Sequence, residues 1–184
     1  MKFRFPGIAC LLVAALAQAH AATTTVVTFG AAPRCAPASD TWLALPACAA
    51  NTSFDALSYS WGASTSGGSV SVSTLQIMKS VDGTSAPLLM KMLAGQSFPH
   101  MRVSVYSTDA AVPANTINPL YELYLSDVYV SAVSTDDAAG GGPPVQVISL
   151  AYGSISVRVV TLNPDGTIAS VNIVGYDQRT ASIF

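Results

Sequence analysis

Residues 54–62 read Phe-Asp-Ala-Leu-Ser-Tyr-Ser-Trp-Gly, and the size of the side chain alternates along this stretch. Large apolar residues stand at positions 57, 59 and 61, and small residues stand at positions 56, 58 and 60. Successive side chains of a β-strand point to opposite faces, so the alternation predicts a strand with one face in a core. Gly67 and Gly68 then predict a turn into a second strand that begins at Val70.

Further stretches of β-branched, aromatic and alternating residues predict strands along most of the remaining chain. These strands cover residues 23–29, 70–78, 101–107, 120–134, 146–162 and 168–174. In the second of them, the apolar alternation changes phase at Ser73 and Thr74, which predicts a β-bulge. Segments rich in Pro, Gly, Asn and Asp separate the strands, and they cover residues 30–51, 109–119, 135–144 and 163–166.

One stretch, residues 85–94, has helical rather than strand periodicity. Ser85 suits an N-cap, Pro87 is tolerated in the first turn, and Gly95 is a typical stop. The apolar residues that recur at helical spacing are Leu88, Leu89, Met92 and Leu93, and we expect this face to pack on the sheets. Many antiparallel strands with a single helix predict a mainly β fold, a compact antiparallel β-barrel or sandwich with one flanking α-helix.

The first 21 residues have the features of a secretory signal peptide. Lys2 and Arg4 precede an apolar run over residues 8–17, and Ala19-His20-Ala21 provides small residues at the positions that a signal peptidase reads. The run is about half of the roughly 20 residues that a membrane-spanning helix needs. We therefore expect a mature chain that starts at Ala22, has no membrane span, and is secreted or periplasmic, with residues 22–184 as a single domain.

Charge and cysteine content limit the function further. Signal removal leaves six basic and ten acidic residues, a net charge of −4, so there is no basic field for nucleic acid. The mature chain keeps two cysteines, Cys35 and Cys48, and an exported protein with an even pair is expected to form a disulfide. The closed loop of roughly 14 residues contributes about 3 kcal/mol in the chain-entropy model. A reactive thiol pair is the alternative, but the C-x-x-C spacing is missing.

No group of residues predicts catalysis. His100 is the only mature histidine, and no G-x-S-x-G elbow is present for a hydrolytic triad. Glu122 is the only glutamate, and Asp127 five residues later would point to the opposite face of a regular strand. Asp136 and Asp137 fall in a loop and are expected to be solvated. We expect no catalytic, cofactor-binding or metal-binding residues and no cofactor, with a carboxylate-dependent secreted hydrolase as the weaker alternative.

Several short motifs occur in an order that resembles one protein family. They are an S-x-S-W-G strand at 58–62, a Gly-Gly turn at 67–68, K-x-V-D at 79–82, S-x-P-L-L at 85–89, a long strand motif at 126–135, V-x-S-L-x-Y-x-x-I at 147–155, and Gly-Tyr-Asp at 175–177. Together they resemble the hemolysin-coregulated protein (Hcp) family, the tube proteins of type VI secretion, over residues 54–177. The resemblance implies a non-enzymatic β-barrel subunit that forms hexameric rings, which stack into a tube and can carry small secreted effectors.

Two features depart from the family pattern. Typical members have no cleavable signal peptide, and the opening loop that holds Cys35 and Cys48 is usually free of cysteine. Two functions therefore stay open. The chain is either a structural ring or tube subunit, or a stand-alone secreted or periplasmic binding module with the same fold, since a fold does not by itself determine function.

Overall fold

The computed structural model describes residues 23–30, 52–107, 119–137, 141–163, 165 and 167–184. The predicted signal peptide and both cysteines of the predicted disulfide, Cys35 and Cys48, lie outside these residues. In chain order the elements of the described part are β1 (Thr23–Phe29), β2 (Ser53–Asp55), β3 (Ser58–Ser60), β4 (Ala63–Ser66), β5 (Ser69–Val72), β6 (Leu75–Ser80), α1 (Ser85–Leu93), β7 (Phe98–Ser107), β8 (Tyr121–Asp136), β9 (Val145–Ala151), β10 (Ser154–Leu162), β11 (Ile168–Asp177) and β12 (Ser182–Ile183).

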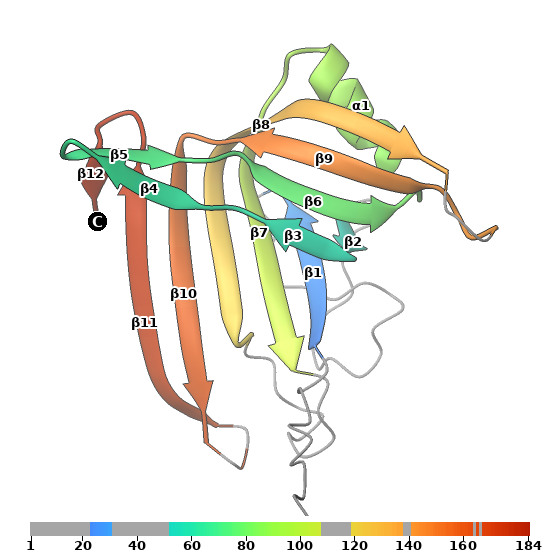
Figure 1. Cartoon of the computed structure of the whole chain (residues 1–184). Helices are drawn as coiled ribbons and strands as arrows, with labels where there is room; N and C mark the ends of the chain where they lie inside the picture. Colours follow the sequence, from blue (N-terminus) through green and yellow to red (C-terminus); the bar gives the residue numbers. More distant parts are fainter. Residues whose placement is uncertain (1–22, 31–51, 108–118, 138–140, 164, 166) are drawn as a thin grey trace, which may run out of the picture.

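The strands form two antiparallel layers that share the long strand β8. One layer has the order β12-β11-β10-β8-β7-β1-β2, and the other has the order β8-β9-β6-β3 (Figure 1). The first part of β8 pairs with β7 and β10, and its second part, from Tyr129, pairs with β9. Between the two parts, Asp127 has a φ of 52°, in the left-handed region that few non-glycine residues adopt. β8 thus changes direction at this residue and passes from one layer into the other.

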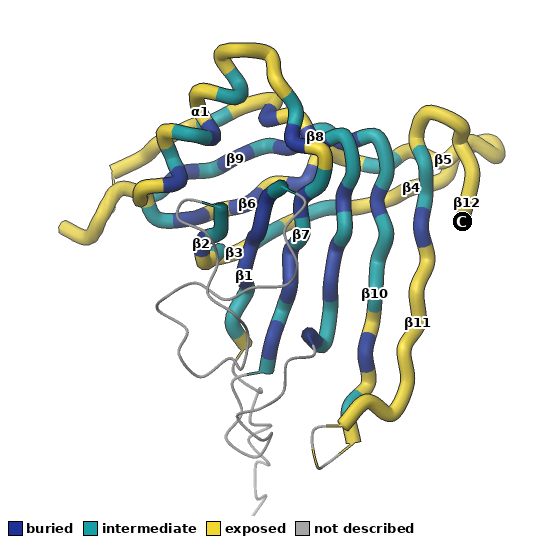
Figure 2. Tube along the Cα trace, turned by 180° about the vertical axis from the view of Figure 1, so that it is seen from behind, coloured by how far each residue is buried: buried dark blue, intermediate teal, exposed yellow. Residues whose placement is uncertain are grey.

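The core lies between the two layers. One layer contributes Val27, Val103, Leu123 and Leu125 among others, and the other contributes Leu75, Ile77, Ile148 and Leu150. Figure 2 shows burial concentrated in the middle strands, with β11 and the β4–β5 hairpin exposed over most of their length. Burial of these aliphatic side chains provides the main driving force for the fold. The mainly β prediction with one flanking helix is confirmed.

The single helix of the described residues is present as predicted, but its packing differs from the prediction. Leu88 is 1% exposed and Met92 packs against the core, whereas Leu89 is half-exposed and Leu93 is 76% exposed. The prediction that all four residues pack on the sheets is therefore wrong for Leu89 and Leu93. A nine-residue helix contacts the sheets through a narrower stripe than its apolar composition suggests. No helix in the described ranges is long and apolar enough to cross a membrane.

The helix ends follow the usual rules in part. The Gly95 φ of 62° and the hydrogen bond from the Gln96 amide to the Lys91 carbonyl, 3.0 Å, close the C-terminus in the expected way. The N-cap is Thr84 rather than Ser85, and no side chain caps the first turn. The Ser85 hydroxyl oxygen instead accepts hydrogen bonds from the Lys79 ammonium and the Asp82 amide.

Four strand predictions need correction. The predicted strand at residues 54–62 is two short strands, β2 and β3, which pair with β1 and β6 respectively, and Leu57 between them is exposed rather than buried. Ser73 and Thr74 do not form a bulge within one strand, because the chain leaves β5 there and enters β6, which pairs with other strands. The predicted strand 146–162 is two strands, β9 and β10, which lie in different layers and are separated by a turn at Tyr152 and Gly153. Because few like charges oppose association, the low charge content favours residues 101–107 as an edge strand that extends a sheet between subunits, but β7 pairs with β1 on one side and with β8 on the other.

Candidate interaction surface

The open edge of the larger layer is β11. It pairs with β10 along its length but with β12 only at Tyr176 and Asp177. Gly175 exchanges two backbone hydrogen bonds with Phe184, so its N–H and C=O point away from β10. Every second residue of a strand presents these groups to the same side, so those of Ile173 and Val171 also point away from β10. No described strand pairs with them, and such an edge is a template for a strand of another chain.

Exposed apolar side chains surround this open edge. We call this group the edge patch, and its members are Ile168, Val171, Ile173, Val174, Ile183 and Phe184. Ile173 is 65% exposed, and the side chains of Ile173 and Val174 lie on opposite faces of the strand. Exposed apolar side chains that occur singly are ordinary on a protein surface. A contiguous group of them on an open strand edge is typical of a protein–protein contact instead.

A β-hairpin arm overhangs the same end of the molecule. The arm consists of β4 and β5, which pair with each other and with no other described strand. Gly67 and Gly68 have φ of 57° and 82° and form its tight turn, as predicted. Figure 1 shows the arm running across the upper ends of β10 and β11 toward β12. The arm is therefore joined to the body at its base and extends over the edge strand.

An apolar cavity of about 200 Å³ lies between the arm and the sheet. We call it the socket. Its lining comes from Trp61, from the arm (Ala63, Val70, Val72), from β10 (Ile155, Val157), and from β11 and β12 (Val174, Gly175, Tyr176, Ile183). Val174 and Ile183 also belong to the edge patch, so the socket opens onto that surface. The lining is almost wholly apolar, which suits an apolar side chain of a partner and excludes a charged ligand.

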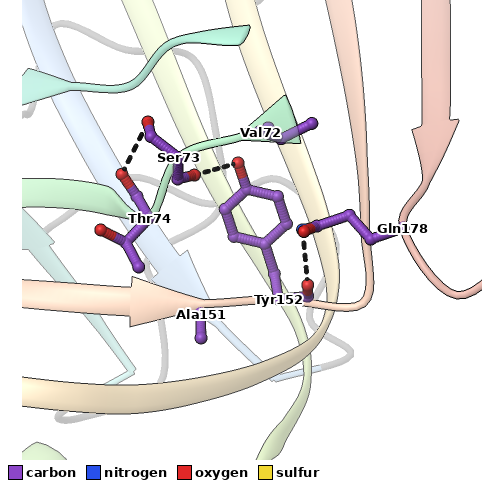
Figure 3. A pocket seen from close by; sticks show the side chains of 6 residues that line it. All are labelled: Val72, Ser73, Thr74, Ala151, Tyr152 and Gln178. Carbon is purple, nitrogen blue, oxygen red and sulfur yellow. Dashed lines mark hydrogen bonds between the residues drawn. The ribbon is translucent and has the colours of Figure 1, made fainter. Parts of the chain in front are cut away.

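Ser73 and Tyr152 hold the base of the arm (Figure 3). The Tyr152 hydroxyl donates a hydrogen bond of 2.7 Å to the Ser73 carbonyl, and the Gln178 side-chain amide donates one of 2.8 Å to the Tyr152 carbonyl. The Ser73 amide donates to the Gly62 carbonyl across the base of the hairpin. Burial raises the pKa of Tyr152 to about 12, so its hydroxyl is a donor at neutral pH.

A second group of exposed apolar side chains lies on α1, which Figure 1 shows on the opposite side of the molecule from β11. We call it the helix patch, and its exposed members are Leu89, Met90 and Leu93. Beside it is a groove of about 470 Å³, lined by Pro87, Met90, Lys91, Ala94, Gln96 and Phe98. The Lys91 ammonium lies 5.5 Å from the centre of the Phe98 ring, which leaves one positive charge at the rim of this apolar surface.

The residues considered for catalysis do not form a site. His100 stacks on Tyr124, with ring centres 5.3 Å apart, and the buried Glu122 lies 3.3 Å from the Ser104 hydroxyl and 3.6 Å from Arg102. Asp127 instead pairs with Arg179 at 2.7 Å. Asp136 ends β8, and Asp137 follows it as an exposed residue. Among the described residues, no cluster of three potential metal ligands is present.

Asp127 belongs to a surface ion network that fixes the C-terminal turn. Arg179 bridges Asp127 and Asp177, with distances of 2.7 Å and 3.1 Å. Hydrogen bonds from Arg179 lower the pKa of Asp177 below its ordinary value, and the same pairing raises the pKa of Arg179. This network connects β8 to the turn before β12. It explains the position of Asp127 without a catalytic role.

The sequence reasoning missed the edge patch, the socket and the helix patch. One signal pointed to the first of them, because Ile173 and Val174 are adjacent apolar residues that a strand must place on both faces. No local signal shows which strand lies at an edge, since edge position depends on pairing between distant segments.

Residues 46–159 match the sequence model of the family described as "Type VI secretion system effector, Hcp". A solved structure of a type six secretion system protein superposes with a TM-score of 0.67 at 19% identity, covering 89% of this chain and 100% of that one. Hcp1 from Salmonella typhimurium has a TM-score of 0.65 at 16% identity and covers 89% and 99%. The secreted protein Hcp3 from Pseudomonas aeruginosa has a TM-score of 0.58 at 13% identity and covers 85% and 98%. No curated protein sequence matches the chain.

Proposed function

This chain belongs to the Hcp family of type VI secretion proteins, and we propose that it is a non-enzymatic subunit that assembles with copies of itself into a hexameric ring. The observation that carries the proposal is the open, apolar edge of β11, whose backbone groups and side chains are both available to a partner. The number six comes from the family. The surfaces that make the contact come from this chain.

The arrangement of the two apolar surfaces favours a head-to-tail contact. Figure 1 shows β11, β12 and the arm on one side of the molecule and α1 on the other. The edge patch and the socket belong to the first group of elements, and the helix patch belongs to α1. When two different surfaces form the contact, each added subunit leaves one edge patch and one helix patch free at the two ends of the assembly. The assembly closes into a ring when the rotation between subunits permits it. A contact between two copies of the edge patch would stop at a dimer.

Mature protein starting at Ala22 tests the proposal by sedimentation velocity over a concentration series. Ile173→Lys places a charge on the open edge, and we expect it to weaken association by about tenfold or more. Leu93→Lys should act in the same way at the helix patch. Leu57→Lys is the matched control, because Leu57 is 59% exposed but lies outside both patches. A strictly monomeric wild-type protein would overturn the ring.

A mixture of the two variants distinguishes the kinds of interface. Ile173→Lys protein retains an intact helix patch, and Leu93→Lys protein retains an intact edge patch. If the contact joins different surfaces, the mixture forms dimers that contain one copy of each and grows no further. If the edge patch pairs with itself, Leu93→Lys protein dimerises alone, and the head-to-tail assignment is wrong.

The non-enzymatic part of the proposal has its own test. Mature protein is screened on ester, peptide and glycan substrates beside its His100→Ala and Glu122→Gln variants. We expect no turnover, since His100, Glu122 and Asp127 have separate partners in the structure. Turnover that either substitution abolishes would restore the hydrolase alternative.

A stand-alone exported module is the second candidate, and the signal peptide predicted over residues 1–21 favours it. Under this proposal the edge patch binds a strand of a different protein outside the cytoplasm. If the protein forms the ring instead, the family resemblance implies that the ring carries small secreted effectors as cargo. N-terminal sequencing of protein from the periplasm and the culture fluid, together with its mass in solution, separates the two. A monomer that starts at Ala22 supports the module, and a hexamer supports the ring.

A further inference from the structure

The arm requires an anchor, because strand pairing does not orient it. Its two strands pair with each other and with no other described strand, and the chain enters and leaves it at Gly62 and Ser73. Figure 1 shows it extended along the top of the molecule rather than within a layer. A hairpin joined in this way can tilt about its base as a rigid unit unless contacts at that base prevent it.

Ser73 makes several of the hydrogen bonds at this base. Its hydroxyl accepts a hydrogen bond of 2.9 Å from the Gly62 amide, and its amide donates one of 2.8 Å to the Gly62 carbonyl. These two bonds close the hairpin but do not connect it to the body. The Ser73 carbonyl makes a hydrogen bond to the body, because it accepts one of 2.7 Å from the Tyr152 hydroxyl (Figure 3). Beside it, the Trp61 indole N–H donates a hydrogen bond of 3.1 Å to the Tyr121 hydroxyl, and Val72 packs against the core.

Tyr152 is itself held in place by the body. Its side chain belongs to the core and is 7% exposed, and its carbonyl accepts from the Gln178 side chain. The adjacent Gly153 amide donates to the Ser126 carbonyl, 2.9 Å, and the Gly153 carbonyl accepts from the Gln178 amide, 2.9 Å. The hydroxyl is thus presented to the arm from a rigid turn between the two layers.

We infer that Tyr152 is the positioning residue that latches the β4–β5 arm over the socket, so that the socket exists before a partner arrives. A preformed site avoids the ordering cost that a partner would otherwise meet on binding. The use of the socket in assembly rests on the proposed function, whereas the latch is a property of the isolated subunit. Tyr152 is the tyrosine of the V-x-S-L-x-Y-x-x-I motif at residues 147–155, and the latch gives that position a physical role.

Tyr152→Phe tests the latch, because it removes the hydroxyl and keeps the ring in the core. Spin labels at Ser66→Cys on the arm and Ala169→Cys on β11 report the distance between arm and edge by pulsed electron resonance. Labelled protein is diluted into excess unlabelled protein so that pairs within one subunit dominate. We expect a narrow distance distribution in the parent protein and a broad one in Tyr152→Phe. Tyr129→Phe, which removes a hydroxyl from an exposed tyrosine on β8, should keep the narrow distribution.

Sedimentation of the unlabelled Tyr152→Phe protein gives the second result. Loss of one hydrogen bond should weaken self-association by about fivefold, because part of the population no longer has a formed socket. An unchanged distance distribution overturns the latch, whatever happens to association. A broad distribution with unchanged association retains the latch but removes the socket from the assembly contact, so the two failures can be told apart.

Discussion

The ammonium of Lys79 lies 2.8 Å from a carboxylate oxygen of Asp82, and the Lys79 side chain is completely buried. The ammonium also donates hydrogen bonds to the Ser80 carbonyl, 2.7 Å, and to the Ser85 hydroxyl, 3.0 Å. The ammonium also lies 5.1 Å from the centre of the Phe54 ring. A buried ammonium needs this full set of partners, because desolvation of a charge is costly. The K-x-V-D motif therefore fixes the connection between β6 and α1.

Asp82→Ala should destabilise the protein by about 3 kcal/mol, because it leaves a buried charge without its counterion. Adding Lys79→Met should recover part of this loss, since the unpaired charge is then removed as well. Urea unfolding of the two single variants and the double variant completes a mutant cycle. If Asp82→Ala and the double variant lose the same free energy of unfolding, Asp82 does not stabilise the protein through its ion pair with Lys79.

The same carboxylate responds to acid. Partial burial alone would raise the pKa of Asp82, but hydrogen bonds from Lys79 and Thr84, together with the Lys79 charge, lower it below the ordinary value of 3.8. A lowered pKa gives stability that is present above the unfolded-state value and is lost as pH falls through the folded-state value. Unfolding free energy should therefore fall more steeply below pH 3.8 in wild-type protein than in Asp82→Ala. Parallel acid profiles would contradict this.

Two leucines of α1 should differ sharply in their contribution to stability. Leu88→Ala removes a side chain that is 1% exposed and should cost about 2 to 5 kcal/mol. Leu93→Ala removes a side chain that is mostly exposed and should cost less than about 0.5 kcal/mol in the monomer. Chemical denaturation at a concentration too low for assembly measures both. A large loss for Leu93→Ala there would mean that the helix patch is covered within the subunit.

Gly175 and Phe184 are predicted to depend on each other. A Cβ at position 175 would overlap the Phe184 ring, so Gly175→Ala should displace the last residues of the chain from β11. Phe184→Ala removes the obstacle, and the double variant should again allow the backbone bonds between positions 175 and 184. Amide hydrogen exchange at position 184 measures this contact. Equal protection in wild-type protein and Gly175→Ala would show that the ring moves aside without loss of pairing.

Alkaline pH should weaken the fold through Tyr152. Burial raises its pKa from 10.0 to about 12, and a raised pKa contributes stability that is fully present below pH 10 and is lost as pH rises through about 12. Wild-type protein should therefore lose more unfolding free energy than Tyr152→Phe between these pH values. Tyr59 and Tyr121 also have raised pKa values, from burial first, so the comparison with the variant is what isolates Tyr152.

The sequence by itself determined the structure of segments whose conformation depends on their neighbours along the chain. The bounds of β1, the tight turn at Gly67 and Gly68, and the end of α1 at Gly95 all follow from local preferences, and the structure agrees with them. The ordered motifs of residues 54–177 gave the family, which the match over residues 46–159 confirms. The signal peptide and the Cys35–Cys48 disulfide stay predictions from the sequence.

Only the tertiary structure decided which apolar surfaces stay exposed. Alternation showed that residues 101–107 and 168–174 are strands, but pairing between distant segments placed β7 in the interior of its layer and β11 at the edge. Helical spacing showed an apolar face on α1, but in the folded chain Leu88 is buried and Leu93 is exposed. Periodicity reports which residues share a face, whereas burial depends on what covers that face. The exposed apolar surfaces on β11 and α1 depend on that coverage, so they can be located only when the whole chain is folded.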